Sequence, residues 1–210
     1  MHRALIVIDV QNEYETGVLP IVHPPLDVSL PNIGRAMDTA TDAGIPVVVV
    51  RQQAPANAAT FALGSPGAEL HPVVVARPYD HLVRKAFPGA FAGTDLADWL
   101  REHHIDVVTL VGFMTQNCVD ATAKQAFDAG LGVEILDDAT GTLPYANSAG
   151  RVEADQLHRT ILIALNARFA AVDNTAAWIR AVAEGAALTG STVFDSATQG
   201  RTGATAASAA

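Results

Sequence analysis

Residues 110–140, LVGFMTQNCVDATAKQAFDAGLGVEILDDAT, contain two apolar runs separated by a segment with helical spacing. The runs at 107–112 and 132–138 are rich in Val, Ile and Leu, which favours β-strands, and Gly130 follows the segment between them, where a helix commonly ends. A strand, a helix and a second strand in direct succession form a unit whose strands run parallel. This stretch therefore predicts a parallel sheet covered by helices, with Cys118, the only cysteine, at the start of the helix.

The same alternation continues along most of the chain. Short β-branched runs alternate with longer segments of helical period, the pattern of a parallel sheet with helices on both faces. The predicted strands span residues 4–10, 46–50, 81–85, 107–112, 132–138 and 169–174. The predicted helices lie near residues 30–43, 94–103, 115–129, 153–165 and 174–184. The fold class is therefore α/β, a single domain with a doubly wound, mostly parallel, six-stranded sheet of the Rossmann-like type.

Two stretches fall outside this alternation. Residues 51–80 are rich in Pro, Ala and Gly and are too long for an ordinary connection, so we expect a functional loop with some structure of its own. Beyond residue 185 the chain becomes rich in Ala, Gly, Ser and Thr, which is typical of a flexible tail. The predicted organisation is one domain over residues 1–185 and a tail over residues 186–210.

Composition restricts the class of protein. Half of the 210 residues are apolar and the formal net charge is −9, which favours a soluble globular protein over a disordered or nucleic-acid-binding one. The apolar runs are far shorter than the ~20 residues that cross a bilayer, and the chain begins with a strand. A single cysteine cannot form an internal disulfide, in agreement with a reducing compartment. We therefore expect a cytoplasmic protein that binds neither nucleic acid nor membranes.

Three residues with reactive side chains lie at or just after the ends of predicted strands. Asp9 ends the first strand within IDVQNEY, Lys85 ends the third within VRKAFPGAF, and Cys118 follows the fourth after VGFMTQN. Ligands of doubly wound sheets bind outside the carboxyl ends of the strands, so these positions indicate a shared site. A helix N-terminus and a nearby lysine lower the pKa of a thiol, and a carboxylate can take its proton. The three residues are candidates for nucleophilic catalysis.

Each of these residues also has a purely structural interpretation. A lone cysteine is often a small core residue, an aspartate can cap a turn, and a lysine can be a solvated surface charge. Composition and spacing alone leave the catalytic and the structural interpretations open.

Longer motifs resemble those of a known family. From about residue 4 to residue 183 the chain is similar to the isochorismatase-like cysteine hydrolases, in IDVQNEY, in RKAFPGAF followed by GTDLADWL, in the stretch around the cysteine, and in LHRTILIALNARFAAVDNTAAW. The resemblance implies the isochorismatase-like hydrolase fold. It also implies a catalytic triad of an Asp, a Lys and a Cys, and these roles fall on Asp9, Lys85 and Cys118.

The same resemblance implies a mechanism. The peptide bond before the cysteine, here Phe113–Met114, is usually cis in the family, and it turns the Met114 N–H toward the site to form an oxyanion hole with the Cys118 N–H. Asp9 takes the thiol proton, the thiolate attacks a small amide, and water hydrolyses the resulting thioester, while Lys85 keeps Asp9 oriented and ionised. No cofactor is required. Family members are usually homo-oligomers, and we expect the same here.

One motif found in part of the family is missing. Nicotinamidases of the family bind a metal through an Asp-x-His pair after the second strand, where this chain has Gln52 and Gln53 in VVVVRQQAP. Neutral amides are poor substitutes for carboxylate and imidazole ligands, so we expect no metal and nicotinamide is disfavoured as the substrate. Four other histidines show no ligand spacing: His71, His81, His103 and His104.

Cys118 bears on which of the family's reactions this chain would catalyse. A second branch of the family hydrolyses the vinyl ether of isochorismate and commonly lacks the cysteine, so Cys118 favours cleavage of a C–N bond in a small amide-type substrate. Tyr14, Phe87 and Phe91 are candidates for the wall of the substrate pocket, although aromatic residues at such spacing also fit a plain core. The 51–80 loop is the expected specificity element. Two alternatives stay open, a vinyl-ether hydrolase and a non-catalytic member that binds a small molecule.

Overall fold

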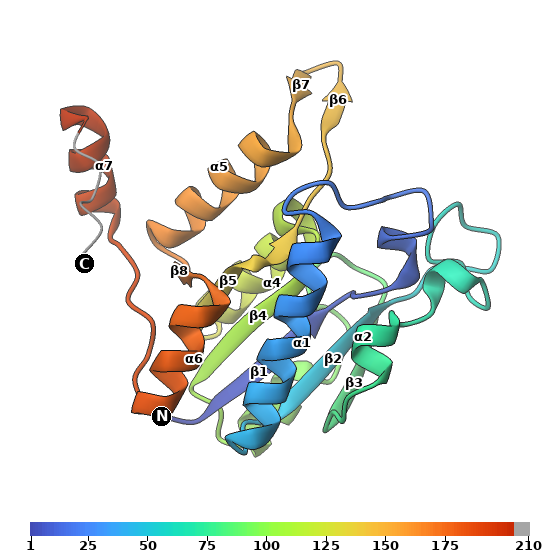
Figure 1. The fold of residues 1–210 in the computed structure, drawn as a ribbon, viewed down its shortest axis with the longest axis horizontal. Coiled ribbons are helices and arrows are strands. Elements are labelled where there is room, and N and C mark those ends of the chain that lie inside the picture. Colours follow the sequence, from blue (N-terminus) through green and yellow to red (C-terminus); the bar gives the residue numbers. More distant parts are fainter. Residues whose placement is uncertain (204–210) are drawn as a thin grey trace.

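The computed structural model describes residues 1–203, and a single parallel sheet forms its centre (Figure 1). The strands follow the order β3-β2-β1-β4-β5-β8, and every neighbouring pair is parallel. The six strands are β1 (Arg3–Ile8), β2 (Val47–Gln52), β3 (His81–Lys85), β4 (Val107–Phe113), β5 (Gly132–Gly141) and β8 (Ala171–Asp173). The predicted α/β, doubly wound class is confirmed, and this sheet is parallel throughout.

The strand order reverses beside β1. The chain moves outward from β1 through β2 to β3, and β4 then returns to the other side of β1. Such a reversal leaves a crevice at the carboxyl ends of the two central strands, because their connections depart in opposite directions. Asp9 follows β1 and Cys118 follows β4, so both lie at this crevice.

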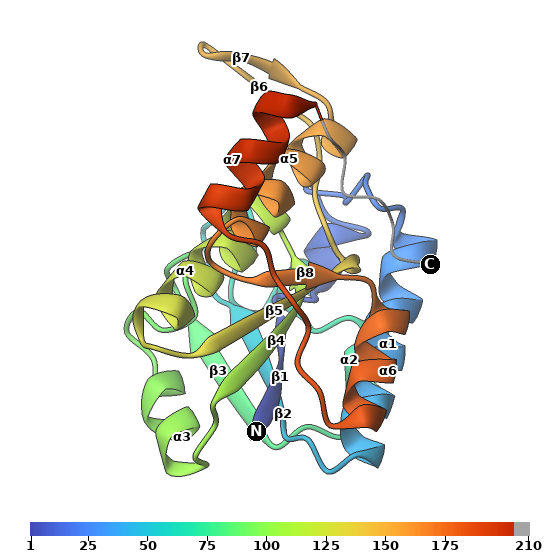
Figure 2. The same cartoon turned by 90° about the vertical axis from the view of Figure 1, so that its left-hand side faces the viewer.

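Helices cover both faces of the sheet, which Figure 2 shows between two helical layers. One layer contains α1 (Leu26–Asp42), α2 (Pro72–Val75) and α6 (Thr175–Glu184), and the other contains α3 (Leu96–Glu102), α4 (Asp120–Asp128) and α5 (Ala154–Asn166). Within β1, Leu5 and Val7 face the first layer and Ile6 faces the second. Burial on both faces explains why the strands are continuously apolar. Across residues 1–203, none of the helices combines the length and apolarity needed to span a membrane.

The first helix begins earlier than predicted. It starts at Leu26 rather than near residue 30, so Pro31 lies inside α1 and not in its first turn. Proline inside a helix loses one hydrogen bond, but burial of Ile33 and Met37 against the sheet stabilises the turns on either side of it. Packing therefore outweighs the tendency of an interior proline to interrupt a helix.

The predicted 51–80 loop has structure of its own. It contains η2 (Pro66–Ala68), a 3₁₀ turn, and the short helix α2. A bridge between Gln11 and Leu70 holds it against the chain just after β1, and a bridge between Ala54 and Ala62 joins two parts of the loop itself. A separate antiparallel hairpin of β6 (Tyr145–Asn147) and β7 (Gly150–Val152), absent from our sequence prediction, projects beyond the sheet (Figure 1).

The segment predicted to be a flexible tail contains a helix, α7 (Val193–Thr202). The Thr192 hydroxyl accepts a hydrogen bond from the Asp195 N–H at 3.0 Å, which caps its N-terminus, and Gly203 ends it in the left-handed conformation. The small polar composition concealed these local capping signals. The rest of the predicted tail, residues 204–210, lies outside the described residues.

A buried ion pair connects β1 to β5 on the α6 side of the sheet. Arg3 donates to both carboxylate oxygens of Glu134 at 2.8 and 2.9 Å, and Thr109 and Trp178 donate to the same carboxylate. Arg3 also donates to the Ala186 carbonyl at 2.8 Å, so the chain just beyond α6 is held against the sheet. Both carboxylate oxygens of Glu134 thus accept hydrogen bonds from other groups of the protein.

We expect Glu134→Gln to lower the free energy of unfolding by about 3–5 kcal/mol, because it leaves the Arg3 guanidinium buried without its counter-charge. Urea denaturation followed by circular dichroism measures the change. The matched control is Glu153→Gln, which removes the exposed partner of Arg151 and should leave the stability nearly unchanged, because solvent screens that pair. Equal effects of the two substitutions would contradict a structural role for the buried pair.

Candidate active site

Asp9, Lys85 and Cys118 meet at the crevice between β1 and β4. The Lys85 ammonium lies 2.7 Å from the Asp9 carboxylate and 3.3 Å from the Cys118 sulfur. The exposed fractions of the three residues are 0%, 2% and 5%. A carboxylate, an ammonium and a thiol in mutual contact away from water form an arrangement suited to proton transfer and nucleophilic attack.

Asp9 directly follows β1 and is held in an unusual backbone conformation. Its φ is +50°, in the left-handed region that Asp adopts more readily than most residues, and its N–H donates to the Val50 carbonyl at 2.9 Å. The neighbouring strand approaches closely because Gly112, with φ +107°, pairs with Ile8, and a Cβ at Gly112 would collide with the Ile8 carbonyl oxygen. β1 and β4 are therefore close together at the point where the site begins.

Cys118 lies in η3 (Thr115–Val119), a π-helical turn that precedes α4. The sequence predicted a helix from residue 115, whereas the structure has this wider turn first, with the Val119 N–H donating to the Met114 carbonyl at 3.2 Å. Such turns occur often at functional sites. The peptide bond between Phe113 and Met114 is cis.

The Lys85 ammonium contacts three oxygen acceptors. Besides Asp9, it donates to Gln52 Oε1 at 2.6 Å and to the Phe87 carbonyl at 3.2 Å. The side chain reaches these groups because β2 and β3 are in parallel register with Gln52 beside Lys85. A buried ammonium requires such partners, since its desolvation is otherwise costly.

Burial, followed by the negative charge of Asp9, raises the pKa of the Cys118 thiol to about 12. The sequence argument, that a helix start and a lysine would lower this pKa, is therefore wrong. Lys85 does act in the expected direction, but it is outweighed by burial and by Asp9. Burial also raises the pKa of Asp9, against the opposing charge of Lys85. At neutral pH the thiol keeps its proton, so any role as a nucleophile would require a base that takes this proton.

A cavity of about 240 Å³ opens beside the cysteine. Its lining is mostly apolar and contains no formally charged residue: Tyr14, Leu19, Gln52, Thr60, Phe61, Ala86, Pro88, Met114, Asn117 and Cys118. It is smaller than the ~300–1,000 Å³ pockets that hold drug-sized ligands. This site therefore suits a small, uncharged molecule.

The aromatic candidates from the sequence divide between the cavity and other places. Tyr14 lines the cavity and contacts Phe61, with ring centroids 5.3 Å apart. Phe87 is 59% exposed and does not line the cavity, although its neighbours Ala86 and Pro88 do. Phe91 packs against the core on the α4 side. The sequence analysis did not identify Phe61, which also lines the cavity. Phe61 belongs to the 51–80 loop, so this loop reaches the site.

The two glutamines at the position of the family's metal motif differ in their contacts. Gln52 lines the cavity and holds Lys85, while Gln53 donates its backbone N–H to the Lys85 carbonyl at 2.9 Å. Within residues 1–203, no three His, Cys, Asp or Glu side chains are grouped so that they could hold a metal ion. The four histidines considered above lie apart from the cavity lining.

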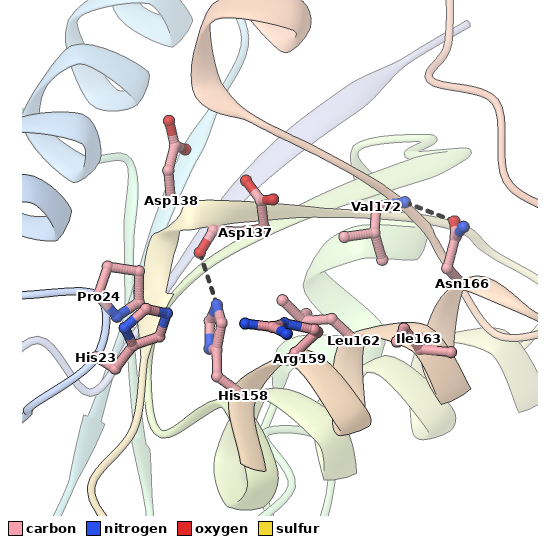
Figure 3. A pocket seen from close by; sticks show the side chains of 10 residues that line it. All are labelled: His23, Pro24, Asp137, Asp138, His158, Arg159, Leu162, Ile163, Asn166 and Val172. Atoms are coloured by element: carbon pink, nitrogen blue, oxygen red, sulfur yellow. Dashed lines mark hydrogen bonds between the residues drawn. The ribbon is translucent and has the colours of Figure 1, made fainter. Parts of the chain in front are cut away.

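A second cavity, of about 380 Å³, lies between α5, strands β5 and β8, and the segment with His23 and Pro24 (Figure 3). His158 Nε2 donates to the Asp137 carbonyl at 3.1 Å, and in the neutral ring Nδ1 therefore accepts from the Thr115 hydroxyl at 2.9 Å. Burial, with the nearby His23, lowers the pKa of His158 to about 4, so it is neutral at physiological pH. Both ring nitrogens are occupied, and none of the triad lines this cavity.

Comparison with known proteins agrees with the motifs. The isochorismatase domain profile matches residues 3–177. The chain belongs to the isochorismatase family. As a member it is an isochorismatase-family hydrolase, and the resemblance seen in the sequence is confirmed.

Three similar proteins illustrate the range of the family. One is a protein from Burkholderia xenovorans LB400 with a known crystal structure, described as an isochorismatase. It is 53% identical to this chain with a TM-score of 0.94, and the match covers 95% of this chain and 96% of that one. The secreted isochorismatase effector Isc1 of Verticillium dahliae is 34% identical over 137 residues, 65% of this chain and 71% of its own. Streptothricin hydrolase of Streptomyces noursei is 32% identical over 142 residues, 67% of this chain and 50% of its own.

We expect Asp9→Asn to accelerate alkylation of Cys118 by iodoacetamide at pH 8 by about tenfold or more. The substitution removes the negative charge that raises the thiol pKa and leaves Lys85 to lower it, and each unit of pKa changes the thiolate fraction by about tenfold. Intact-protein mass spectrometry follows the reaction, because Cys118 is the only cysteine.

The control for this experiment is Asp98→Asn, which alters an exposed carboxylate paired with Arg101 and should leave the rate unchanged. Rapid alkylation of the unaltered protein at pH 7, slowed by Asp9→Asn, would contradict a raised thiol pKa.

Proposed function

We propose that this protein is a cysteine hydrolase that cleaves the C–N bond of a small, uncharged amide-type substrate through a thioester on Cys118. The observation that carries the proposal is the buried contact of the Lys85 ammonium with both the Cys118 sulfur and the Asp9 carboxylate, at the wall of a small cavity without charged residues.

The first half of the reaction forms the thioester. Asp9 accepts the thiol proton as the Cys118 sulfur attacks the carbonyl carbon, and the N–H groups of Met114 and Cys118 donate to the oxygen that becomes negative. The tetrahedral intermediate collapses by breaking the C–N bond, and the protonated Asp9 gives its proton to the departing nitrogen. Ammonia or an amine leaves, and the acyl group remains on the sulfur.

The second half regenerates the enzyme. Asp9 takes a proton from a water molecule whose oxygen attacks the thioester carbon, and collapse breaks the C–S bond. The carboxylic acid leaves, and the proton on Asp9 returns to the sulfur of Cys118. Each proton taken by Asp9 is thus returned within the cycle.

Lys85 stabilises both charge states of this cycle. As the proton moves from sulfur to carboxylate, the negative charge moves from Asp9 to Cys118, and the ammonium lies near both, at 2.7 and 3.3 Å. A cation that contacts the donor and the acceptor reduces the cost of forming the buried thiolate without having to move.

The cavity favours an amide over isochorismate. Isochorismate carries two carboxylates, and none of the residues lining the cavity provides a positive charge to receive them. Vinyl-ether hydrolysis also makes no use of a thiol. The name of streptothricin hydrolase, a relative at 32% identity, is in keeping with a hydrolytic role for this chain.

We expect Cys118→Ala to reduce turnover by several orders of magnitude while the protein stays folded, because the covalent route is lost and alanine fits the position. Asp9→Asn should do nearly the same, and the double variant should be no worse than either, since the two residues act in one proton transfer. Circular dichroism is the folding control. If folded Cys118→Ala keeps more than about a tenth of the activity, the activation free energy has risen by less than ~1.4 kcal/mol. That result would exclude the thiol as the nucleophile.

We also expect the substrate class to emerge from a screen of small amides, ureas, carbamates and lactams run beside isochorismate. Release of ammonia or amine, together with an acyl mass increase on Cys118 in quenched samples, is the expected result. Turnover of isochorismate alone would support the vinyl-ether alternative. Binding detected by a shift in melting temperature, without turnover of any compound, would support the non-catalytic one.

A further inference from the structure

Gln52 occupies a position at the active site that the mechanism above does not use. It is the last residue of β2, pairs in register with Lys85 on β3, and lines the cavity beside Cys118. Its side chain therefore contacts the triad on one side and the substrate space on the other.

The ammonium of Lys85 fixes which way the Gln52 amide faces. An ammonium has only donors, so the atom 2.6 Å from Lys85 Nζ must be the amide oxygen and not the amide nitrogen. The nitrogen then lies on the other branch and donates one hydrogen to the Ala86 carbonyl at 3.3 Å. An amide nitrogen carries two hydrogens, and the contacts within residues 1–203 give the second one no acceptor.

The backbone that carries this amide is also held in place. The buried Gln11 side chain accepts from the Gln52 N–H at 2.9 Å and donates to the Gln52 carbonyl at 3.0 Å. The same Gln11 nitrogen donates to the Ala68 carbonyl at 2.8 Å, which ties the 51–80 loop to this point. A side chain with a clamped backbone and an oriented amide is preorganised for recognition.

We propose that Gln52 is a positioning and specificity residue: its oxygen holds Lys85 between Asp9 and Cys118, and its remaining N–H receives an uncharged acceptor oxygen of the substrate. This inference rests on the proposed function. It specifies the substrate class further, as small neutral amides that carry a second oxygen beyond the scissile group. A substrate carboxylate beside the Gln52 N–H would meet only the amide dipole, because none of the residues lining the cavity is positively charged.

The test compares two small amides, malonamide, which has a second carbonyl oxygen, and butyramide, which lacks one. Each is measured by the concentration that protects Cys118 from iodoacetamide, so the readout does not depend on turnover. We expect malonamide to protect at a concentration about tenfold lower in the unaltered protein, the effect of one hydrogen bond. Gln52→Met, of similar size but without amide groups, should reduce this preference to about one.

Two further variants sharpen the test. Gln52→Glu keeps an oxygen for Lys85 but has no N–H, so it should also lose the preference for malonamide. Gln53→Met changes the adjacent residue, whose side chain does not line the cavity, and should keep it. An undiminished preference in Gln52→Met, equal protection by the two amides, or no protection by either, would overturn the proposal. The proposed function fails separately, by the absence of acyl-enzyme and of turnover in the substrate screen.

Discussion

The buried ammonium of Lys85 constrains the whole carboxyl edge of the sheet. Removing a positive charge from water is costly unless several acceptors replace the lost hydration, and here Asp9, Gln52 and the Phe87 carbonyl do so. These groups come from the ends of β1 and β2 and from the loop after β3, and the Cys118 sulfur comes from the turn after β4. A shift of one strand would remove one of these contacts from the buried charge, so the contacts of Lys85 and the strand register support each other.

Sequence alone could predict the sheet and the place of the triad, because both follow from strong patterns. Strands buried on both faces are continuously apolar, and chemistry in this fold gathers where the strands end. The weaker signals failed where tertiary contacts decide. The position of Phe87 illustrates this, because its neighbours Ala86 and Pro88 line the cavity while Phe87 itself is exposed. Composition likewise concealed the Thr192 cap of α7, and packing placed Pro31 inside α1.

The thiol pKa is the most instructive difference between sequence and structure. A helix dipole contributes at most ~2 kcal/mol, and a neighbouring lysine adds to it, yet the pKa of Cys118 rises from 9.0 to about 12 because the sulfur is buried beside Asp9. Burial is a property of the folded chain and cannot be read from the residues around the cysteine. The consequence is a thiol that keeps its proton at neutral pH, so that its reactivity depends on a neighbouring base.

Charge balance inside the site also restricts what it can bind. The positive charge of Lys85 is already matched by Asp9, so none remains for an anionic ligand. The cavity lining adds no charge of its own, and recognition there must rely on shape and on dipoles such as the Gln52 amide. A relative with the same triad that acts on an anion would need a cationic residue in the cavity wall. The identity of the residues that line the cavity, rather than the triad, is therefore what separates one substrate class from another on this fold.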